Sequence, residues 1–113
     1  MEVITALEAF GALSNETRLW VFRLLVQAGP QGMSAGDIAD RLSARQNTMS
    51  SHLKLLQQSG LIQSRRDGRS VIYSADYDTV RQLIVFLMQD CCAGNQAVCR
   101  PIAESLARTA PVK

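Results

Sequence analysis

Three cysteines lie close together near the end of the chain, and the sequence contains no others: Cys91, Cys92 and Cys99. As thiolates they form a soft ligand set, and a pyramid of three sulfurs suits trivalent arsenic or antimony. Cys91 and Cys92 would point about 100° apart on a helix, so the helix end must unwind for both to reach one ion. Gly94 would let the chain fold back and deliver Cys99. The spacing therefore predicts a site for As(III) or Sb(III).

Other uses of the same thiols stay open. Cadmium or lead could bind with water or Asp90 completing the shell, whereas structural zinc normally needs a fourth protein ligand, and none is obvious nearby. The cysteines could instead act as a redox or sulfide switch, through a disulfide or polysulfide that includes Cys99. Cys91 alone would pass as a core residue, because it continues an apolar stripe of the helix before it.

Arginines gather in a second short segment: Arg65, Arg66 and Arg69 lie within five positions of one another. The sequence has 12 Lys and Arg against 10 Asp and Glu, so this local clustering matters more than the net charge of +2. Asp67 and Gly68 are typical of a two-residue turn between strands, here residues 61–66 and 69–74. The pattern predicts a basic β-hairpin.

Two capping boxes in succession precede the hairpin, beginning at Ser34 and at Ser43. They predict two short helices joined by a tight turn, which is the helix-turn-helix arrangement. Residues 31–33 are interpreted as a connector before them. The second helix would extend to about Ser59, where Gly60 would end it. A basic hairpin directly after such a pair is typical of a wing that lies along the DNA backbone or minor groove.

The second helix of the pair has two faces. Met49, Leu53 and Leu56 share one face and should pack on the core. The opposite face carries short polar side chains, which suit the major groove because Asn and Gln read adenine edges and Ser donates or accepts. The residues predicted to contact DNA, from this helix and the wing, are Arg45, Gln46, Asn47, Thr48, Ser50, Ser51, His52, Lys54, Arg65, Arg66 and Arg69.

His52 lies near the boundary between these faces. It could hydrogen-bond a phosphate or pack against the preceding helix. As the only histidine it cannot build a histidine-rich metal site. A Cys–His nucleophile pair would require His52 to meet cysteines from the far end of the last helix, and the sequence has no Gly-rich phosphate loop. We therefore expect no enzymatic activity, and no resident cofactor is needed.

Further helices are predicted on both sides of this unit. One covers residues 3–12, and the next begins after Ser14 or Asn15 and ends at Gly29. A last long helix covers residues 77–92, capped by Asp76 or Asp78, and the tail holds one turn near residues 102–106. This order predicts a mainly α fold with a β-hairpin wing, a winged helix-turn-helix with extra N- and C-terminal dimerisation helices. We assign residues 1–94 to that domain and 95–113 to a tail carrying the third cysteine.

The bulk composition limits the class of protein. A chain of 113 residues with 47% apolar residues is long enough for one compact domain. No stretch approaches the roughly 20 apolar residues of a membrane span, and no basic segment precedes an apolar one at the start. The sequence therefore predicts a cytoplasmic protein with no membrane partner, and an odd cysteine count there favours free thiols or metal ligands.

Three consecutive motifs resemble the ArsR-type winged-helix repressors. Residues 13–25 (LSNETRLWVFRLL) are similar to the family's opening helix, residues 46–56 (QNTMSSHLKLL) to its recognition helix, and residues 59–62 and 65–73 to its wing. The resemblance covers about residues 5–92. It implies a homodimer that binds double-stranded operator DNA, represses transcription and leaves when an inducer binds.

The cysteine triplet resembles the C-terminal arrangement of some arsenite-responsive members. The best-known arsenite sensors instead carry Cys-x-Cys on the helix aligned with residues 34–42, and zinc sensors use Asp and His pairs on the last helix. This chain has neither. The sequence supports the dimer independently, because residues 83–88 are apolar around the whole helix and residues 3–12 offer a second apolar face.

Overall fold

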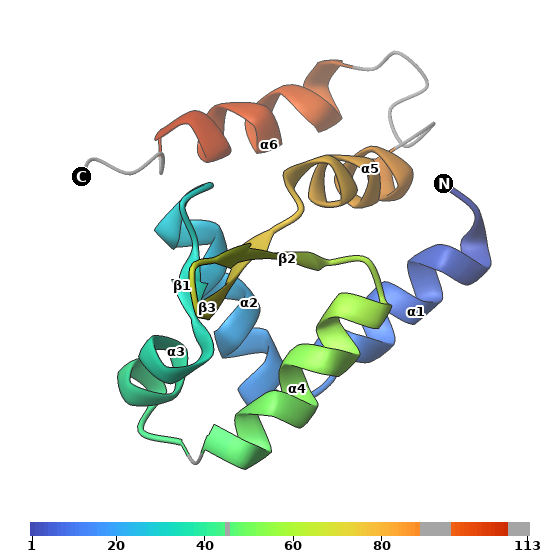
Figure 1. The fold of residues 1–113 in the computed structure, drawn as a ribbon. Coiled ribbons are helices and arrows are strands. Elements are labelled where there is room, and N and C mark those ends of the chain that lie inside the picture. Colours follow the sequence, from blue (N-terminus) through green and yellow to red (C-terminus); the bar gives the residue numbers. More distant parts are fainter. Residues whose placement is uncertain (45, 89–95, 109–113) are drawn as a thin grey trace.

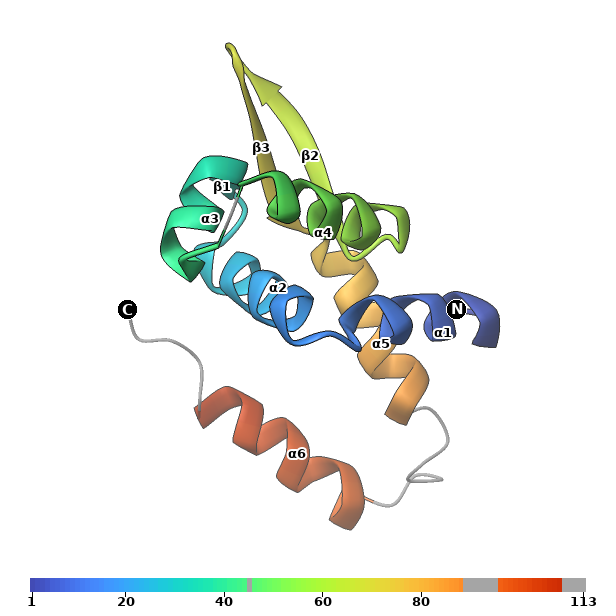
Figure 2. The ribbon, with the colours of Figure 1, turned by 90° about the horizontal axis from the view of Figure 1, so that it is seen from below.

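The computed structural model describes residues 1–44, 46–88 and 96–108, without the side chains of residues 46, 47, 96, 98, 99 and 108. Helices form the body and a β-hairpin projects from it (Figures 1 and 2). The described elements are α1 (Val3–Leu13), α2 (Glu16–Ala28), β1 (Met33–Ser34), α3 (Ala35–Leu42), α4 (Gln46–Gln58), β2 (Ile62–Asp67), β3 (Ser70–Ala75), α5 (Tyr77–Met88) and α6 (Gln96–Arg108). The predicted winged helix-turn-helix is confirmed.

Three helices begin at side-chain caps that the sequence indicates. Each cap oxygen accepts a hydrogen bond of 3.1–3.2 Å from the backbone N–H three residues later, which satisfies a donor that the helix itself cannot. The caps are Asn15, Ser34 and Asp76. Of the alternatives that the sequence left open, α2 therefore uses Asn15, and α5 uses Asp76.

The second capping box is not used as predicted. Ser43 ends α3, with φ 53° in the left-handed region, and its backbone N–H points back to carbonyls of α3. An N-cap needs an extended backbone, so Ser43 cannot also begin α4. α4 begins at Gln46 instead.

Three antiparallel strands form a small sheet in the order β1-β3-β2. The segment predicted as a connector thus contributes a short strand, in which Met33 pairs with Tyr73. Gly32 precedes it with φ +71°, and a Cβ there would lie 2.2 Å from the Tyr73 carbonyl oxygen. Only glycine permits this approach.

The turn at the wing tip lies one residue later than predicted. Asp67 pairs with Ser70, so Gly68 and Arg69 form the turn. Gly68 has φ +65°, and Arg69 does not share its positive φ. Positive φ at the first central residue alone is typical of the type II′ hairpin.

The core lies between α2, α3, α4 and the base of the wing. Its largest fully buried side chains are Leu25, Ile38, Met49, Leu53, Leu56, Leu61 and Val21. The predicted inner face of α4 is confirmed, because Met49, Leu53 and Leu56 are at most 1% exposed.

The tail is more helical than predicted. α6 spans 13 residues rather than one turn, with Pro101 inside it. Within the described residues, no helix is both long and apolar enough to cross a membrane.

Candidate nucleic-acid interface

α4 has a polar outer face and a fully buried apolar inner face. Thr48, Ser50, Ser51 and Lys54 are exposed. A helix whose apolar side is fixed in the core presents its polar side in a defined orientation, as a groove-reading helix must. Arg45 and the side chains of Gln46 and Asn47 lie outside the described part of the chain.

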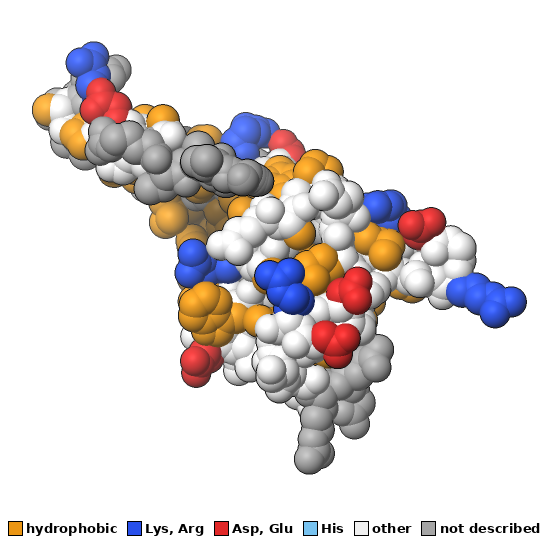
Figure 3. Space-filling view, turned by 90° about the vertical axis from the view of Figure 1, so that its left-hand side faces the viewer, with side chains coloured by type: hydrophobic (Ala, Val, Ile, Leu, Met, Phe, Trp, Pro, Cys, Tyr) orange, Lys and Arg blue, Asp and Glu red, His pale blue; other side chains and the backbone are white. Residues whose placement is uncertain are grey.

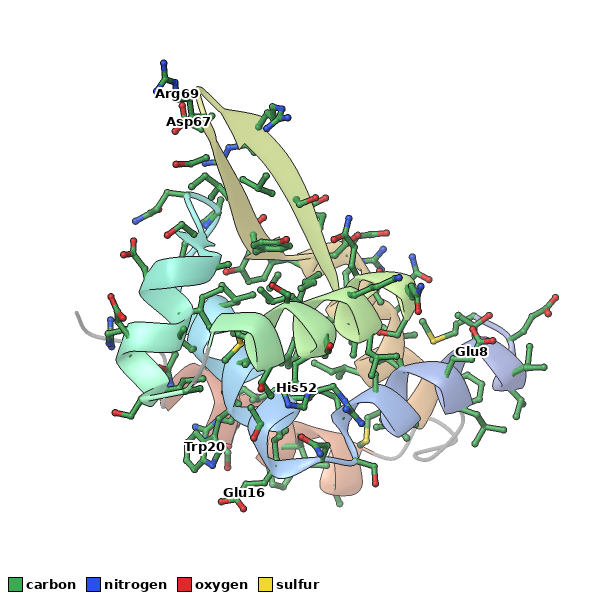
Figure 4. All side chains as sticks on the ribbon, turned by 60° about the horizontal axis from the view of Figure 1, so that its bottom comes forward. Glu8, Glu16, Trp20, His52, Asp67 and Arg69 are labelled. Carbon is green, nitrogen blue, oxygen red and sulfur yellow. The ribbon has the colours of Figure 1, made fainter. Side chains whose placement is uncertain are left out.

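The wing projects beyond the helical body (Figure 2). Ile62 anchors its base in the core, whereas every later residue of β2 is exposed. Arg69 lies at the very tip beside Asp67 (Figure 4), and in Figure 3 the same arm extends to the right with basic and acidic side chains near its end. Among the described residues, Lys54, Arg66 and Arg69 form no ion pair. These cations are therefore available to a polyanion.

Arg65 is engaged within the protein. Its Nη2 atom donates to the Gln31 carbonyl oxygen at 2.8 Å, and its Nη1 atom donates to the Pro30 carbonyl oxygen at 3.3 Å. The structure thus separates Arg65 from the other two wing arginines with which the sequence groups it.

A side-chain hydrogen bond connects α4 to the wing. Gln57 Nε2 donates to Ser64 Oγ at 3.1 Å. Sequence reasoning missed both residues, and no local signal could have found them, because the contact exists only once α4 and β2 are placed against each other.

His52 points away from the wing, into the space between α4 and α2 (Figure 4). Its Nδ1 atom lies 3.4 Å from Nη1 of Arg18, whose Nε donates to the Ala12 carbonyl oxygen at 2.6 Å. Burial, and then the Arg18 cation, lower the pKa of His52. The described contact of His52 is thus a hydrogen bond to α2 rather than packing against α3, and its predicted bond to a DNA phosphate stays a prediction.

Trp20 marks a groove at the other end of the helix-turn-helix. Half of its surface is exposed, and the Arg23 guanidinium lies 5.4 Å from its ring centroid, a cation–π distance. The groove beside it is lined by the turn between α3 and α4, from Leu42 to Ala44.

The terminal helices of the winged unit leave large apolar side chains uncovered. Their exposed fractions run from 45% to 64%, and the residues are Val3, Ile4 and Leu7 of α1 with Ile84, Val85 and Leu87 of α5. Large apolar side chains left exposed on both helices of so small a domain indicate an interaction surface.

The cysteine site lies mostly outside the described residues. Cys91 and Cys92 fall in the undescribed segment, and Cys99 is described only as backbone of the first turns of α6. Among described side chains, no three His, Cys, Asp or Glu residues are placed to hold a metal ion. The predicted thiolate site therefore remains a prediction.

A polar helix backed by a sealed core, next to a projecting basic hairpin, defines a winged helix-turn-helix transcriptional regulator. Comparison with known proteins agrees. A family model described as "Helix-turn-helix domain" matches residues 13–65. The transcriptional activator HlyU of Vibrio cholerae is 31% identical over 85 residues, 75% of this chain and 76% of that one. The regulator YbzH of Bacillus subtilis is 31% identical over 93 residues, 72% of this chain and 93% of that one.

Solved structures give the same result. An ArsR-like transcriptional regulator from Rhodococcus matches with a TM-score of 0.69 at 26% identity, covering 97% of this chain and 96% of that one. HlyU matches with a TM-score of 0.63 at 29% identity, covering 81% of this chain and 99% of that one. The chain belongs to the ArsR family of winged-helix transcriptional regulators. It is a regulator and not an enzyme, as the sequence predicts.

Proposed function

We propose that this chain is a homodimeric repressor that binds double-stranded operator DNA and leaves it when trivalent arsenic, or antimony, binds the thiolates of Cys91, Cys92 and Cys99. The observation that carries the DNA-binding part is the pairing of two surfaces: the exposed polar face of α4 and the wing beside it with Arg66 and Arg69 exposed. The short side chains of α4 suit base edges, and the wing cations suit phosphates.

The dimer is supported by the uncovered apolar faces of α1 and α5. Pairing them across a two-fold axis would bury both faces and direct two recognition helices at half-sites about one DNA turn apart. A winged helix-turn-helix domain of Mycobacterium bovis, similar in fold at 24% identity, is described as homodimeric.

The effector part is supported by the chemistry of the three sulfurs, which form the soft donor set that As(III) prefers. Two similar proteins have names that point to metal or arsenical resistance. They are a CadC homolog from Staphylococcus aureus, a cadmium resistance regulatory protein 34% identical over 77 residues, and a possible regulator for arsenical resistance, similar in fold at 24% identity. Binding of an ion by these cysteines, which follow α5 in the sequence, would shift the subunits, and a coupling of a few kcal/mol would weaken DNA binding about 100-fold.

A redox or sulfide signal through the same cysteines is the second candidate. HlyU, which the chain resembles over most of its length, has been solved in a form described as reduced. HlyU is named an activator, so the direction of regulation is tested separately with a reporter gene behind the chain's own promoter.

The deciding experiment titrates the complex of the full chain with its own promoter-region DNA, against arsenite, antimonite, cadmium, zinc and peroxide in parallel. We expect salt-sensitive binding and release by arsenite or antimonite. Cys99→Ser should still bind DNA but no longer release it. Release of Cys99→Ser by arsenite contradicts the three-thiolate site, release by peroxide alone supports the redox candidate, and no salt-sensitive binding refutes the regulator itself.

A further inference from the structure

Arg65 and Arg66 are neighbours on β2, so their side chains leave the strand on opposite faces. Arg66 shares its face with Ser64, two residues earlier, and Ser64 accepts the hydrogen bond from Gln57 of α4. The Arg66 face therefore adjoins the recognition helix. Arg65 projects from the other face, where its guanidinium reaches the chain between α2 and β1.

The Arg65 guanidinium spans two consecutive carbonyl oxygens, those of Pro30 and Gln31. A guanidinium is planar and offers donors in a fixed fork, so two acceptors hold it in one orientation where a single acceptor would not. Donors that are occupied in this way are withdrawn from DNA. Two of its five N–H donors are occupied in this way, and the guanidinium is held toward the body of the protein.

The turn that supplies these carbonyls is itself fixed. The Gly32 backbone N–H donates to the Gly29 carbonyl oxygen at 3.1 Å. Gly32 also packs so closely on Tyr73 that no Cβ fits, and β1 directly after it pairs with β3. Arg65 therefore connects the exposed part of the wing to an anchored point of the body.

We propose that Arg65 is a positioning residue that sets the angle of the wing, and that Arg66 and Arg69 reach the DNA backbone only while Arg65 holds the Pro30 and Gln31 carbonyls. This inference rests on the proposed operator binding by α4 and the wing. The wing beyond Arg65 is short, but a small rotation still moves its tip by several ångströms. Strands rise about 3.3 Å per residue, so the tip lies about 10 Å beyond Arg65, and a rotation of about 20° would move it by about 3–4 Å. That displacement is enough to break a phosphate contact.

A double-mutant cycle distinguishes positioning from direct binding. Four proteins are compared on the same promoter-region duplex: the unchanged chain, Arg65→Ala, the double variant Arg66→Ala/Arg69→Ala, and the triple variant. Each dissociation constant is measured over a range of salt concentrations. Every phosphate contact contributes about 0.9 to the slope of log K against log [salt]. We expect Arg65→Ala alone to lower the slope by nearly as much as the double variant, about 1.8, and the triple variant to bind no more weakly than the double. Independent, additive losses would overturn the proposal.

A charge-conserving pair supplies the matched control. Arg66→Lys keeps a cation at a phosphate contact and should retain its part of the slope. Arg65→Lys keeps the charge but loses the two-carbonyl fork, so we expect it to lose slope almost as Arg65→Ala does. An Arg65→Lys protein with the full slope would show that only the charge matters and would refute positioning.

Backbone ¹⁵N relaxation of the free protein separates this proposal from the proposed function. We expect Arg65→Ala to lower the order parameters of residues 66–71 and to leave those of α4 unchanged. An unchanged wing overturns the positioning role whatever the DNA result, and loss of order across both elements indicates a general folding role instead. If the wing alone loosens but the unchanged chain binds no DNA, the proposed function fails and the link between Arg65 and wing angle survives.

Discussion

Gln57, in the last turn of α4, donates a hydrogen bond of 3.1 Å from its Nε2 atom to Ser64 Oγ on β2. Arg65 donates from the opposite face of the same strand to the Pro30 and Gln31 carbonyl oxygens. The wing is therefore held on both of its faces. The polar helix α4 and the basic hairpin are thereby connected near the wing's base as well as through the core. This connection gives the first of five testable predictions.

We expect Ser64→Ala and Gln57→Ala each to lower the free energy of unfolding by about 0.5 kcal/mol, the low end for a hydrogen bond because both side chains are exposed. Urea denaturation measures each value. Since the two residues share one interaction, the double variant should lose little more than either single variant. Fully additive losses would show that the bond contributes nothing in solution.

Gly32 and Gly68 both have positive φ but differ in their surroundings. A Cβ at Gly32 would meet the Tyr73 carbonyl at 2.2 Å, whereas nothing lies within 4 Å of one at Gly68. We expect Gly68→Ala to cost about 1 kcal/mol from backbone strain alone, and Gly32→Ala about 2–4 kcal/mol because β1 must also move. Equal shifts of the urea midpoint would contradict the close approach.

Leu53 and Lys54 are adjacent on α4 and should separate stability from DNA binding. Leu53 is 1% exposed, so Leu53→Ala should lower the free energy of unfolding by about 2–5 kcal/mol. Lys54→Ala should change stability by less than about 0.5 kcal/mol and lower the salt slope of DNA binding by about 0.9. A normal slope in Lys54→Ala would remove that residue from the interface.

Stability should fall as His52 becomes protonated. Burial and Arg18 place its pKa in the folded chain below the ordinary value of 6.5, so the unfolded chain binds the proton first as the pH drops. The free energy of unfolding is therefore full above pH 6.5, declines as the pH falls through 6.5, and levels off below the folded pKa. His52→Asn has no proton to bind, so its pH dependence should be flatter over that window. Parallel curves for the two proteins from pH 7.5 to 5 would rule this out.

A charge on the uncovered face of α5 should prevent self-association. Leu87 is 58% exposed, and Leu87→Glu should shift the chain from dimer to monomer in analytical ultracentrifugation and weaken operator binding with it. The matched control is Leu106→Glu on α6, at a residue that is 57% exposed but lies outside the α1 and α5 faces. Disruption by both variants would extend the interface to α6, and a dimer that survives both variants would show that Leu87 of α5 is not in the interface.

Local chemistry explains which parts of this fold were predictable. Asn15, Ser34 and Asp76 were recognisable because a cap satisfies donors of its own helix, within three residues. The inner face of α4 followed from periodicity, which reports burial directly. The winged helix-turn-helix followed from two successive capping boxes and a basic hairpin, although the second box, at Ser43, does not cap α4 in the structure.

The features that the sequence did not determine depend on distant partners or on competing local choices. Ser43 carries no C-cap signal, because a left-handed φ favours Gly or Asn, and yet it ends α3 with φ 53°. β1 is only two residues long, so it cannot show the alternation of apolar and polar residues that marks a strand. It forms because β3 pairs with it. In the sequence, Arg65 is indistinguishable from the other wing arginines. The carbonyl groups that it binds lie 34 and 35 residues away in the chain. In the candidate site, the polar face of α4 was predictable from the sequence. The internal hydrogen bonds that distinguish Arg65 from Arg66 and Arg69 were not.

Trp20 is the only tryptophan in the chain, and it stands half-exposed beside the turn that joins the two helices of the DNA-binding motif. The tryptophan fluorescence of this protein therefore has a single origin, next to the place where docking on a duplex would change the environment. Binding and release can be followed optically on the unmodified chain, with no dye competing for its cysteines.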